Sequence, residues 1–177
     1  MLFWIPITPA SIAPSIAILS SSLEKYLPSY IGDQGETSMC VAYALATCRT
    51  IIYARNKNMT NRDDIFRNSF SPFFVYYNVK SPSDKQCTFG LNVLDAVNTL
   101  EDKGIAKLSD VEYPNYWPFT TKQLCVHYPP SYSNDVNDAR KYTIDDPKSL
   151  SGNLSNSDKV IALKGELAAG NPIFFGM

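Results

Sequence analysis

The stretch that decides the fold spans residues 33–50 and reads Asp33-Gln34-Gly35-Glu36-Thr37-Ser38-Met39-Cys40-Val41-Ala42-Tyr43-Ala44-Leu45-Ala46-Thr47-Cys48-Arg49-Thr50. It begins with a polar turn, since Asp33 and Gly35 are turn formers. Thr37 and Ser38 can accept hydrogen bonds from free N–H groups. Apolar residues then recur at three- and four-residue spacing, which places them on one buried helix face: Val41, Ala44, Leu45, Cys48, Ile51 and Ile52. The stretch predicts a turn followed by a buried helix over about residues 38–54.

The predicted helix places Cys40 in or near its first turn, where a cysteine gains reactivity. N–H groups at a helix N-terminus carry partial positive charge, which favours the thiolate, the nucleophilic form. Gln34 lies six residues upstream, across the turn. Its side-chain amide could donate to an oxygen on the atom that Cys40 attacks, which is the oxyanion-stabilising role. We therefore expect Cys40 and Gln34 to form a catalytic pair; the alternative is that Cys40 is an ordinary buried helix cysteine.

This stretch resembles the active-site segment of papain-like cysteine peptidases. In that family an Asp-Gln-Gly turn precedes the nucleophile helix, and Gln and Cys lie six positions apart. The strict pattern C-G-[SA]-C-[WY] around the nucleophile is absent, because Thr37, Ser38, Met39 and Val41 occupy the flanking places. The resemblance is closer to the divergent microbial and viral branch. It implies an α+β papain-like fold, with a helical left lobe around the nucleophile helix and an incomplete β right lobe.

Two further helices fit the resemblance. Ser71 is a candidate N-cap and Pro72 suits the first helical position, so an aromatic helix is predicted to follow. In the family a similar helix packs beside the nucleophile helix. The second predicted helix carries an apolar face and stops at Gly104; that face comprises Leu91, Leu94, Val97 and Leu100.

The turn before this second helix is where the resemblance places the substrate. The family has a glycine-rich turn there, whose backbone pairs with an extended peptide. The resemblance therefore implies substrate-binding roles for Gly90 and for Phe89 beside it, although Phe89 departs from the family's Gly-Gly pair. Cys87 is expected to pack at this turn rather than to take part in the chemistry.

The resemblance divides the chain into three segments. They are an extended N-terminal arm over residues 1–24, a helical lobe over 25–122 and the start of a β lobe over 123–177. The arm is apolar and interrupted by prolines, without the basic start of a secretory signal.

In the β lobe, Lys141-Tyr142-Thr143-Ile144 predicts a strand. Residues 158–169 predict a helix that is capped by Ser157, and Ile173 begins another strand. The apolar stripe of this helix is predicted at Val160, Leu163 and Leu167.

A cysteine peptidase also needs a base, which accepts the thiol proton and later protonates the leaving amine. In papain-like enzymes His and Asn follow the Cys by roughly 130–150 residues, a window that runs past the last residue, Met177. The single histidine, His127, matches no family position and is expected to be a surface residue. Three explanations stay open: the chain is a fragment, a second polypeptide supplies the His-bearing half, or the scaffold no longer catalyses.

Composition bounds the remaining possibilities. A net charge of −1 argues against a nucleic-acid partner. The sequence has no apolar run of the ~18–20 residues that a membrane span needs. One histidine and the absence of a C-x-x-C pair argue against a zinc site, so no metal or other cofactor is expected. Thr37 stands where secreted family members carry a disulfide cysteine, which favours an intracellular or otherwise reducing setting.

The sequence as a whole predicts a papain-like cysteine-type peptidase that acts on peptide or protein substrates, in a truncated or incomplete form that lacks its general base. The alternative is a catalytically inactive papain-like module that binds peptides or serves a structural role.

Overall fold

The computed structural model describes residues 2–4, 23–111, 138–145, 147–149 and 154–175. These residues form a mixed, helix-rich structure with few strands. Its α-helices are α1 (Cys40–Asn56), α2 (Arg62–Arg67), α3 (Pro72–Val79), α4 (Val93–Asp102) and α7 (Asn156–Ala168). Two 3-10 helices, η1 (Glu24–Tyr26) and η2 (Arg140–Tyr142), and three strands, β1 (Leu2–Trp4), β2 (Lys148–Ser149) and β3 (Ile173–Phe175), complete the described part.

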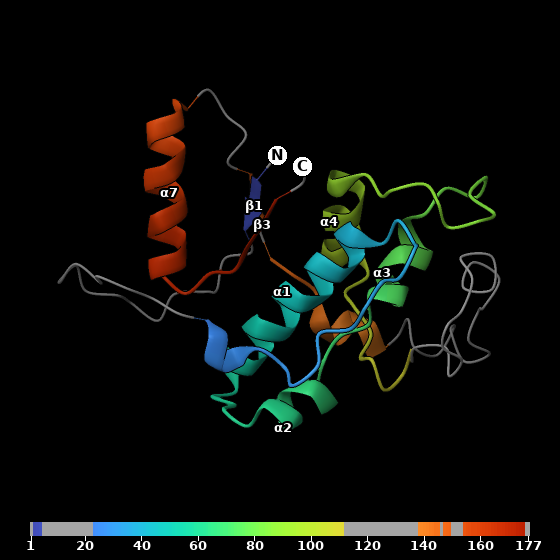
Figure 1. Ribbon diagram of the computed structural model, residues 1–177, viewed down its shortest axis with the longest axis horizontal. Helices are drawn as coiled ribbons and strands as arrows, with labels where there is room; N and C mark the ends of the chain where they lie inside the picture. The colour runs from blue at the N-terminus through green and yellow to red at the C-terminus, as the bar shows by residue number, and fades with distance from the viewer. Residues whose placement is uncertain (1, 5–22, 112–137, 146, 150–153, 176–177) are drawn as a thin grey trace.

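Helix α1 is the central element, as predicted, and begins at Cys40 (Figure 1). It contacts α3 and α4 on one side and β3 and η1 on another. Because neighbours cover it on more than one side, its buried residues extend beyond the single predicted face. Val41 and Ala44 of that face are only half-buried, whereas Ala42 and Ala46 are buried.

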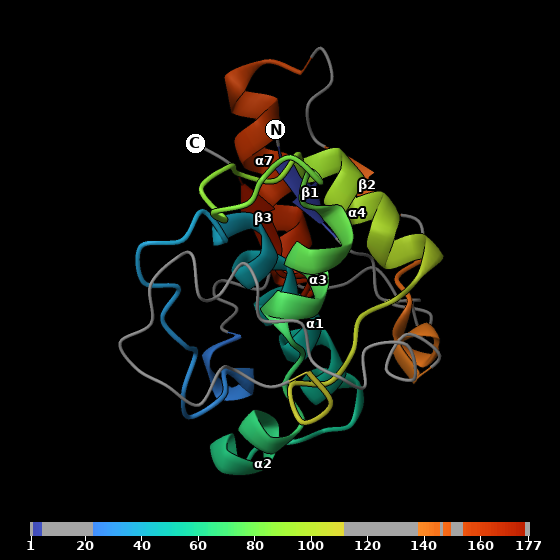
Figure 2. The same ribbon diagram turned by 90° about the vertical axis from the view of Figure 1, so that its right-hand side faces the viewer.

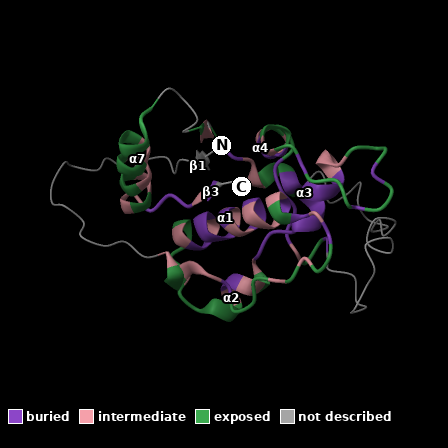
Figure 3. Ribbon diagram, turned by 45° about the horizontal axis from the view of Figure 1, so that its top comes forward, coloured by how far each residue is buried: buried purple, intermediate pink, exposed green. Residues whose placement is uncertain are grey.

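Helix α3 forms as its sequence predicts. The Ser71 Oγ atom accepts a hydrogen bond from the Phe74 N–H (3.3 Å) and donates one to the Val111 carbonyl oxygen (2.7 Å). Pro72 opens the helix, and residues 72–77 are all buried. The predicted aromatic helix beside α1 is therefore confirmed as part of the core, which Figure 3 shows as the buried ribbon around α1 and α3.

The apolar face predicted for the next helix is partly wrong. Asn92 caps α4, accepting from the N–H groups of Leu94 and Asp95, so Leu91 precedes the helix. The buried face is formed by Ala96, Val97 and Leu100. Leu94 is 46% exposed because the helix register set by the Asn92 cap turns it away from the core. The predicted stop is confirmed, since Gly104 follows the helix with φ 74°, a conformation that favours glycine.

The strand predicted at Lys141–Ile144 is wrong. Residues 140–142 form η2, and the chain after it pairs with helices instead of a sheet. Arg49 of α1 donates to the carbonyl oxygens of Tyr142 and Thr143, both at 3.4 Å. The Ile144 N–H donates to the Leu100 carbonyl oxygen at 3.3 Å. These partners use backbone groups that a strand would have placed in a ladder.

The sheet is assembled from both ends of the described chain (Figures 1 and 2). The strand order is β2-β1-β3, and β1 is antiparallel to both neighbours. Phe3 lies opposite Ser149 on one side and Phe174 on the other. The predicted strand at Ile173 is therefore confirmed, and residues 2–4 of the N-terminal arm form the central strand.

Helix α7 begins earlier than predicted and is poorly covered. Its cap is Ser155 rather than Ser157, since the Ser155 Oγ accepts from the Asp158 N–H at 3.2 Å. Val160 and Leu167 of the predicted apolar stripe are 47% and 43% exposed, and Figure 3 shows the helix as largely exposed. Leu163 of the stripe is half-buried, and Leu167 lines an apolar groove together with residues of α1 and β3. None of the described helices is long and apolar enough to cross a membrane.

Candidate active site

Cys40 is the first residue of α1, and its side chain is an exposed free thiol. The N-cap residue is Met39, which makes no side-chain capping hydrogen bond. The expectation that Thr37 and Ser38 accept from the helix is wrong. The Thr37 Oγ1 donates to the Gln34 carbonyl oxygen (2.7 Å), and the Ser38 Oγ donates to the Thr88 carbonyl oxygen (2.8 Å). The N-terminus of α1 is thus left without a hydroxyl cap beside the thiol.

The Asp33–Gly35 turn is fastened to α1. The Gly35 N–H donates to the Asp33 Oδ1 atom at 2.8 Å, and Gly35 has φ 58°, which favours glycine. The Tyr43 hydroxyl, one turn into α1, donates to the Asp33 carbonyl oxygen at 3.0 Å. Gln34 is half-buried, and its side-chain amide has no hydrogen-bond partner within the described residues. Its N–H donors therefore remain available for a ligand.

The loop that carries Phe89 and Gly90 lies against the residues before Cys40 (Figure 1). The Ser38 N–H donates to the Cys87 carbonyl oxygen at 3.2 Å, and the Ser38 Oγ adds the bond to Thr88. Phe89 is 54% exposed, and a Cβ atom at Gly90 would meet nothing within 4 Å. The structure thus brings the residues predicted to bind substrate to the end of α1 that carries the thiol.

The cysteines in the described part differ sharply. Burial raises the pKa of the Cys48 thiol to about 12, which leaves it protonated at neutral pH. Cys87 is disulfide-bonded, with φ 54°. A disulfide is typical of oxidising compartments, so it does not favour the reducing setting expected from the sequence. Cys40 is the only exposed free thiol among these described cysteines; Cys125 lies outside the described residues.

Asp84 lies next to the candidate site and was not singled out by the sequence. It is buried beside the loop of Phe89. In the sequence it follows Ser81, Pro82 and Ser83, which predict an exposed turn. Burial acts to raise the pKa of its carboxyl group. Hydrogen bonds from the Tyr76 hydroxyl and from the N–H groups of Thr88, Phe89 and Gln86 outweigh burial and hold that pKa below its usual range.

An apolar groove of about 530 Å³ runs along α1. Ala44, Thr47, Cys48 and Ile51 of α1 line one wall, and Ile173 and Phe174 of β3 line another. These α1 residues follow Cys40 by 4, 7, 8 and 11 positions, which is the spacing of one helix face. The groove therefore lies on the face of α1 that has Cys40 at its N-terminal end.

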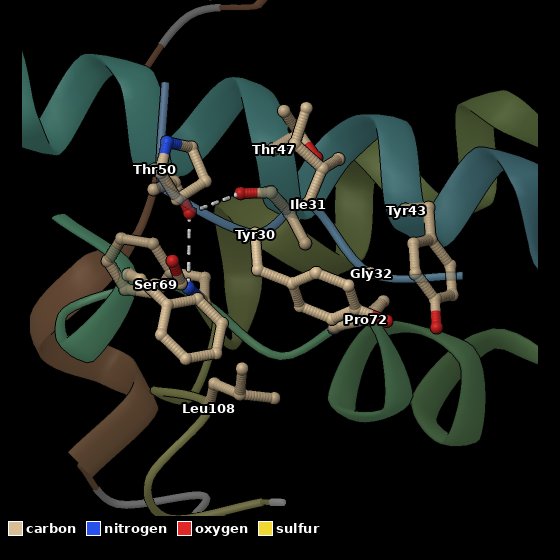
Figure 4. A pocket seen from close by; sticks show the side chains of 13 residues that line it. Tyr30, Ile31, Gly32, Tyr43, Thr47, Thr50, Ser69, Pro72 and Leu108 are labelled. Atoms are coloured by element: carbon tan, nitrogen blue, oxygen red, sulfur yellow. Dashed lines mark hydrogen bonds between the residues drawn. The ribbon is translucent and has the colours of Figure 1, made fainter. Parts of the chain in front are cut away.

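A second, much smaller pocket of about 20 Å³ lies between α1 and residues 28–32 (Figure 4). Such a volume holds about one water molecule. Beside it, the Thr50 Oγ1 donates to the Ala46 carbonyl oxygen (2.8 Å) and accepts from the Phe70 N–H (3.1 Å). These bonds join α1 to the segment that leads into α3 and belong to the scaffold.

The described residues include neither a histidine nor a metal site. The single histidine, His127, lies outside them. In the same described part, no group of three or more His, Cys, Asp and Glu side chains could hold a metal ion.

Comparison with known proteins gives one distant likeness. No family model and no curated protein matches the sequence. The chain is similar to the crystal structure of xylellain, a cysteine protease from Xylella fastidiosa, with 17% sequence identity and a TM-score of 0.49. The match covers 76% of this chain and 55% of that one, so the chain spans about half the length of that structure.

Proposed function

We propose that this chain provides the nucleophile-bearing part of a papain-like cysteine peptidase of α+β fold. One observation carries the proposal: the exposed free thiol of Cys40 stands at the uncapped N-terminus of a 17-residue helix that the core surrounds. At this position the sulfur atom lies beside the partial positive charge of the helix N-terminus. The buried helix behind it holds the sulfur atom in a fixed place.

The neighbouring residues take matching roles in this mechanism. The Cys40 sulfur attacks a peptide carbonyl carbon, and the carbonyl oxygen becomes negatively charged. The Gln34 side-chain amide and the Cys40 backbone N–H donate to that oxygen. The backbone beside Phe89 and Gly90 binds the peptide in an extended form.

The general base comes from outside the described residues. An imidazole there accepts the thiol proton and returns it to the leaving amine. A second polypeptide that supplies the His-bearing half is one source. Loss of one member of a catalytic triad lowers the rate by several orders of magnitude, so the isolated chain is expected to be a weak or inactive peptidase.

A second candidate function is a papain-like module that binds peptides without cleaving them. The exposed Phe89 side chain and the open space at Gly90 support it, since both leave this edge accessible to a peptide. Both functions use the same peptide-binding edge, but only the first needs a reactive Cys40. The thiol chemistry of Cys40 therefore separates them.

The experiment measures the rate at which iodoacetamide alkylates each cysteine of the folded chain at neutral pH, mapped by mass spectrometry. The control is Asn98→Cys in a Cys40→Ser background, since residue 98 is exposed on α4 but lies away from a helix end. A helix N-terminus contributes about 0.3–1 kcal/mol, so Cys40 should react about two- to fivefold faster than the control thiol. Equal rates would leave Cys40 an ordinary surface cysteine and overturn the peptidase proposal.

Three variants then test the roles when the His-bearing half is present. Cys40→Ser should leave the fold intact and abolish hydrolysis of a peptide substrate. Gln34→Ala should lower the hydrolysis rate markedly and change the free energy of unfolding little, since Gln34 acts on the oxyanion. His127→Ala should change little, and a large loss of activity would instead make His127 the base.

A further inference from the structure

The most enclosed carboxylate in the described part of the chain lies beside the proposed peptide-binding edge. Asp84 stands in the loop between α3 and α4, and its exposure is 1%. Its Oδ1 atom accepts from the N–H groups of Gln86 (3.3 Å) and Thr88 (3.2 Å). Its Oδ2 atom accepts from the Tyr76 hydroxyl (2.8 Å) and the Phe89 N–H (3.3 Å). Each carboxylate oxygen therefore accepts at least two hydrogen bonds.

These bonds fold residues 84–89 around one side chain. The three backbone donors lie two, four and five positions after Asp84, so the carboxylate fixes the path of the loop up to Phe89. The fourth donor is the hydroxyl of Tyr76, which belongs to α3 and is fully buried. The same hydroxyl lies 2.8 Å from the Phe89 carbonyl oxygen. Because that hydroxyl has one proton, it donates either to Asp84 or to the Phe89 carbonyl oxygen at any moment, and both acceptors lie within its reach.

The other side of the loop faces the nucleophile. The carbonyl oxygens of Cys87 and Thr88 accept from the backbone N–H and the hydroxyl of Ser38, which lies two residues before Cys40. The loop thus donates backbone N–H groups to Asp84. The carbonyl groups of Cys87 and Thr88 point the other way, to the segment that enters α1. The loop is held between a buried carboxylate and the start of the nucleophile helix.

We propose that Asp84 is a positioning residue. Through Tyr76 and the loop backbone it sets the position and orientation of the backbone of residues 88–90 relative to Cys40. The proposal rests on the proposed function, because it assigns Asp84 to the peptide-binding edge of that same site. Asp84 touches neither the peptide nor the thiol; it acts through the backbone that binds the peptide. The loop that Asp84 positions exposes the Phe89 side chain and the open backbone of Gly90 to a peptide.

An ionised carboxylate is the side chain that this arrangement requires. Four donors converge on two oxygen atoms, and both oxygen atoms accept only in a carboxylate. An Asn side chain would place an NH₂ group either against the Gln86 and Thr88 N–H groups or against the Phe89 N–H. The buried N–H groups left unsatisfied would then move toward water, and the loop with them.

The test compares two alkylating reagents that share one warhead. The alkylation rate with iodoacetamide reports the reactivity of the Cys40 thiol alone. The rate with iodoacetyl-trialanine amide depends on the same reactivity and also on binding of the reagent's extended peptide backbone. In the unmodified chain the peptide reagent should alkylate Cys40 faster than iodoacetamide. Asp84→Asn should lower the ratio of the two rates about tenfold, the loss expected for a hydrogen bond to a charged group, and leave the iodoacetamide rate within about twofold.

Two further variants make the result decisive. Tyr76→Phe removes one donor to Asp84 without changing any charge and should lower the ratio in the same direction. Asp102→Asn, an exposed acid at the end of α4, is the matched control and should leave the ratio unchanged. If Asp84→Asn does not fold, Tyr76→Phe alone decides.

The outcomes separate the two proposals. Equal rates for both reagents in the unmodified chain would overturn peptide binding at this site, and so the proposed function. A faster peptide reagent with the same ratio in Asp84→Asn and Tyr76→Phe would overturn only the positioning role. A parallel fall of both rates together with a lower melting temperature would also overturn it, because Asp84 would then support the fold alone.

Discussion

The Nζ atom of Lys107 lies 3.5 Å from the ring centroid of Tyr53. Phe70 and Tyr142 place two more rings within 4.0 and 4.9 Å of the same ammonium group, which donates to the Asn68 carbonyl oxygen at 2.6 Å. Lys107 is only 8% exposed. This aromatic cage joins α1, the segment that leads into α3 and η2 around one cation, and η2 is held there rather than in a sheet.

The Lys107 cage makes stability depend on pH above neutrality. Burial, with Arg49 nearby, lowers the pKa of Lys107 to about 7, and Asp110 opposes the shift. In the unfolded chain a lysine keeps its proton up to about pH 10.4. Between these values the unfolded state binds more protons than the folded state, so the free energy of unfolding should rise with pH from about 7 to 10. Urea unfolding at pH 7, 8 and 9 measures the slope.

Replacement of Lys107 by methionine tests the origin of this slope. Lys107→Met keeps an unbranched side chain that packs on rings and should flatten the pH dependence above pH 7. Lys103→Met, an exposed lysine at the end of α4, is the matched control and should keep the slope. The same slope in both variants would show that another group causes it.

Replacement of a glycine by alanine should lower the free energy of unfolding at Gly104 and raise it at Gly165. A Cβ atom on Gly104 would lie 2.0 Å from the Ala139 carbonyl oxygen, and its φ is 74°. Gly104→Ala should therefore lower the free energy of unfolding by at least about 2 kcal/mol. Gly165 lies within α7 with open space around it, and Gly165→Ala should raise that energy by about 0.5–1 kcal/mol. A mild effect at Gly104 would mean that residues 138–145 do not pack on α4 in this way.

The two serine caps provide a second matched pair. Ser71 is fully buried and bonds on both sides, to Phe74 and to Val111. Ser71→Ala should cost about 1–3 kcal/mol, because it leaves the Val111 carbonyl group unsatisfied in the core. Ser155 is exposed and caps α7, so Ser155→Ala should cost about 1 kcal/mol at most. Thermal melts of both variants give the comparison, and a larger loss at Ser155 would contradict the burial argument.

The Cys48 thiol should report unfolding. Cys48 is buried at 7% exposure, and burial raises its pKa to about 12. In native buffer alkylation should therefore modify Cys40 and leave Cys48 untouched; in urea Cys48 should become reactive along the same transition that circular dichroism follows. Modification of Cys48 at the Cys40 rate in native buffer would show that the groove beside it opens without global unfolding.

Local patterns in the sequence determined where the helices near the candidate site begin and end. Helical periodicity places Cys40 in or near the first turn of α1, capping chemistry places Ser71 and Pro72 at the start of α3, and Gly104 follows α4 as the predicted stop. These features depend on neighbours within one or two turns, so a single sequence carries the signal. The strand at Ile173–Phe175 was predictable for the same reason.

Tertiary structure alone decided the features that depend on distant partners. The strand expected at Lys141–Ile144 is absent because Arg49 and Leu100, remote in sequence, take its backbone hydrogen bonds. Asp84 reads as an ordinary turn residue, and only the fold surrounds it with four donors. A hydroxyl such as that of Ser38 can cap a helix or bind a loop, and the choice follows from which partner the packed chain brings within reach. The sequence by itself thus determined local helix boundaries and offered candidate site residues, and the tertiary structure decided which of these residues lie together, because that depends on contacts between segments far apart in the chain.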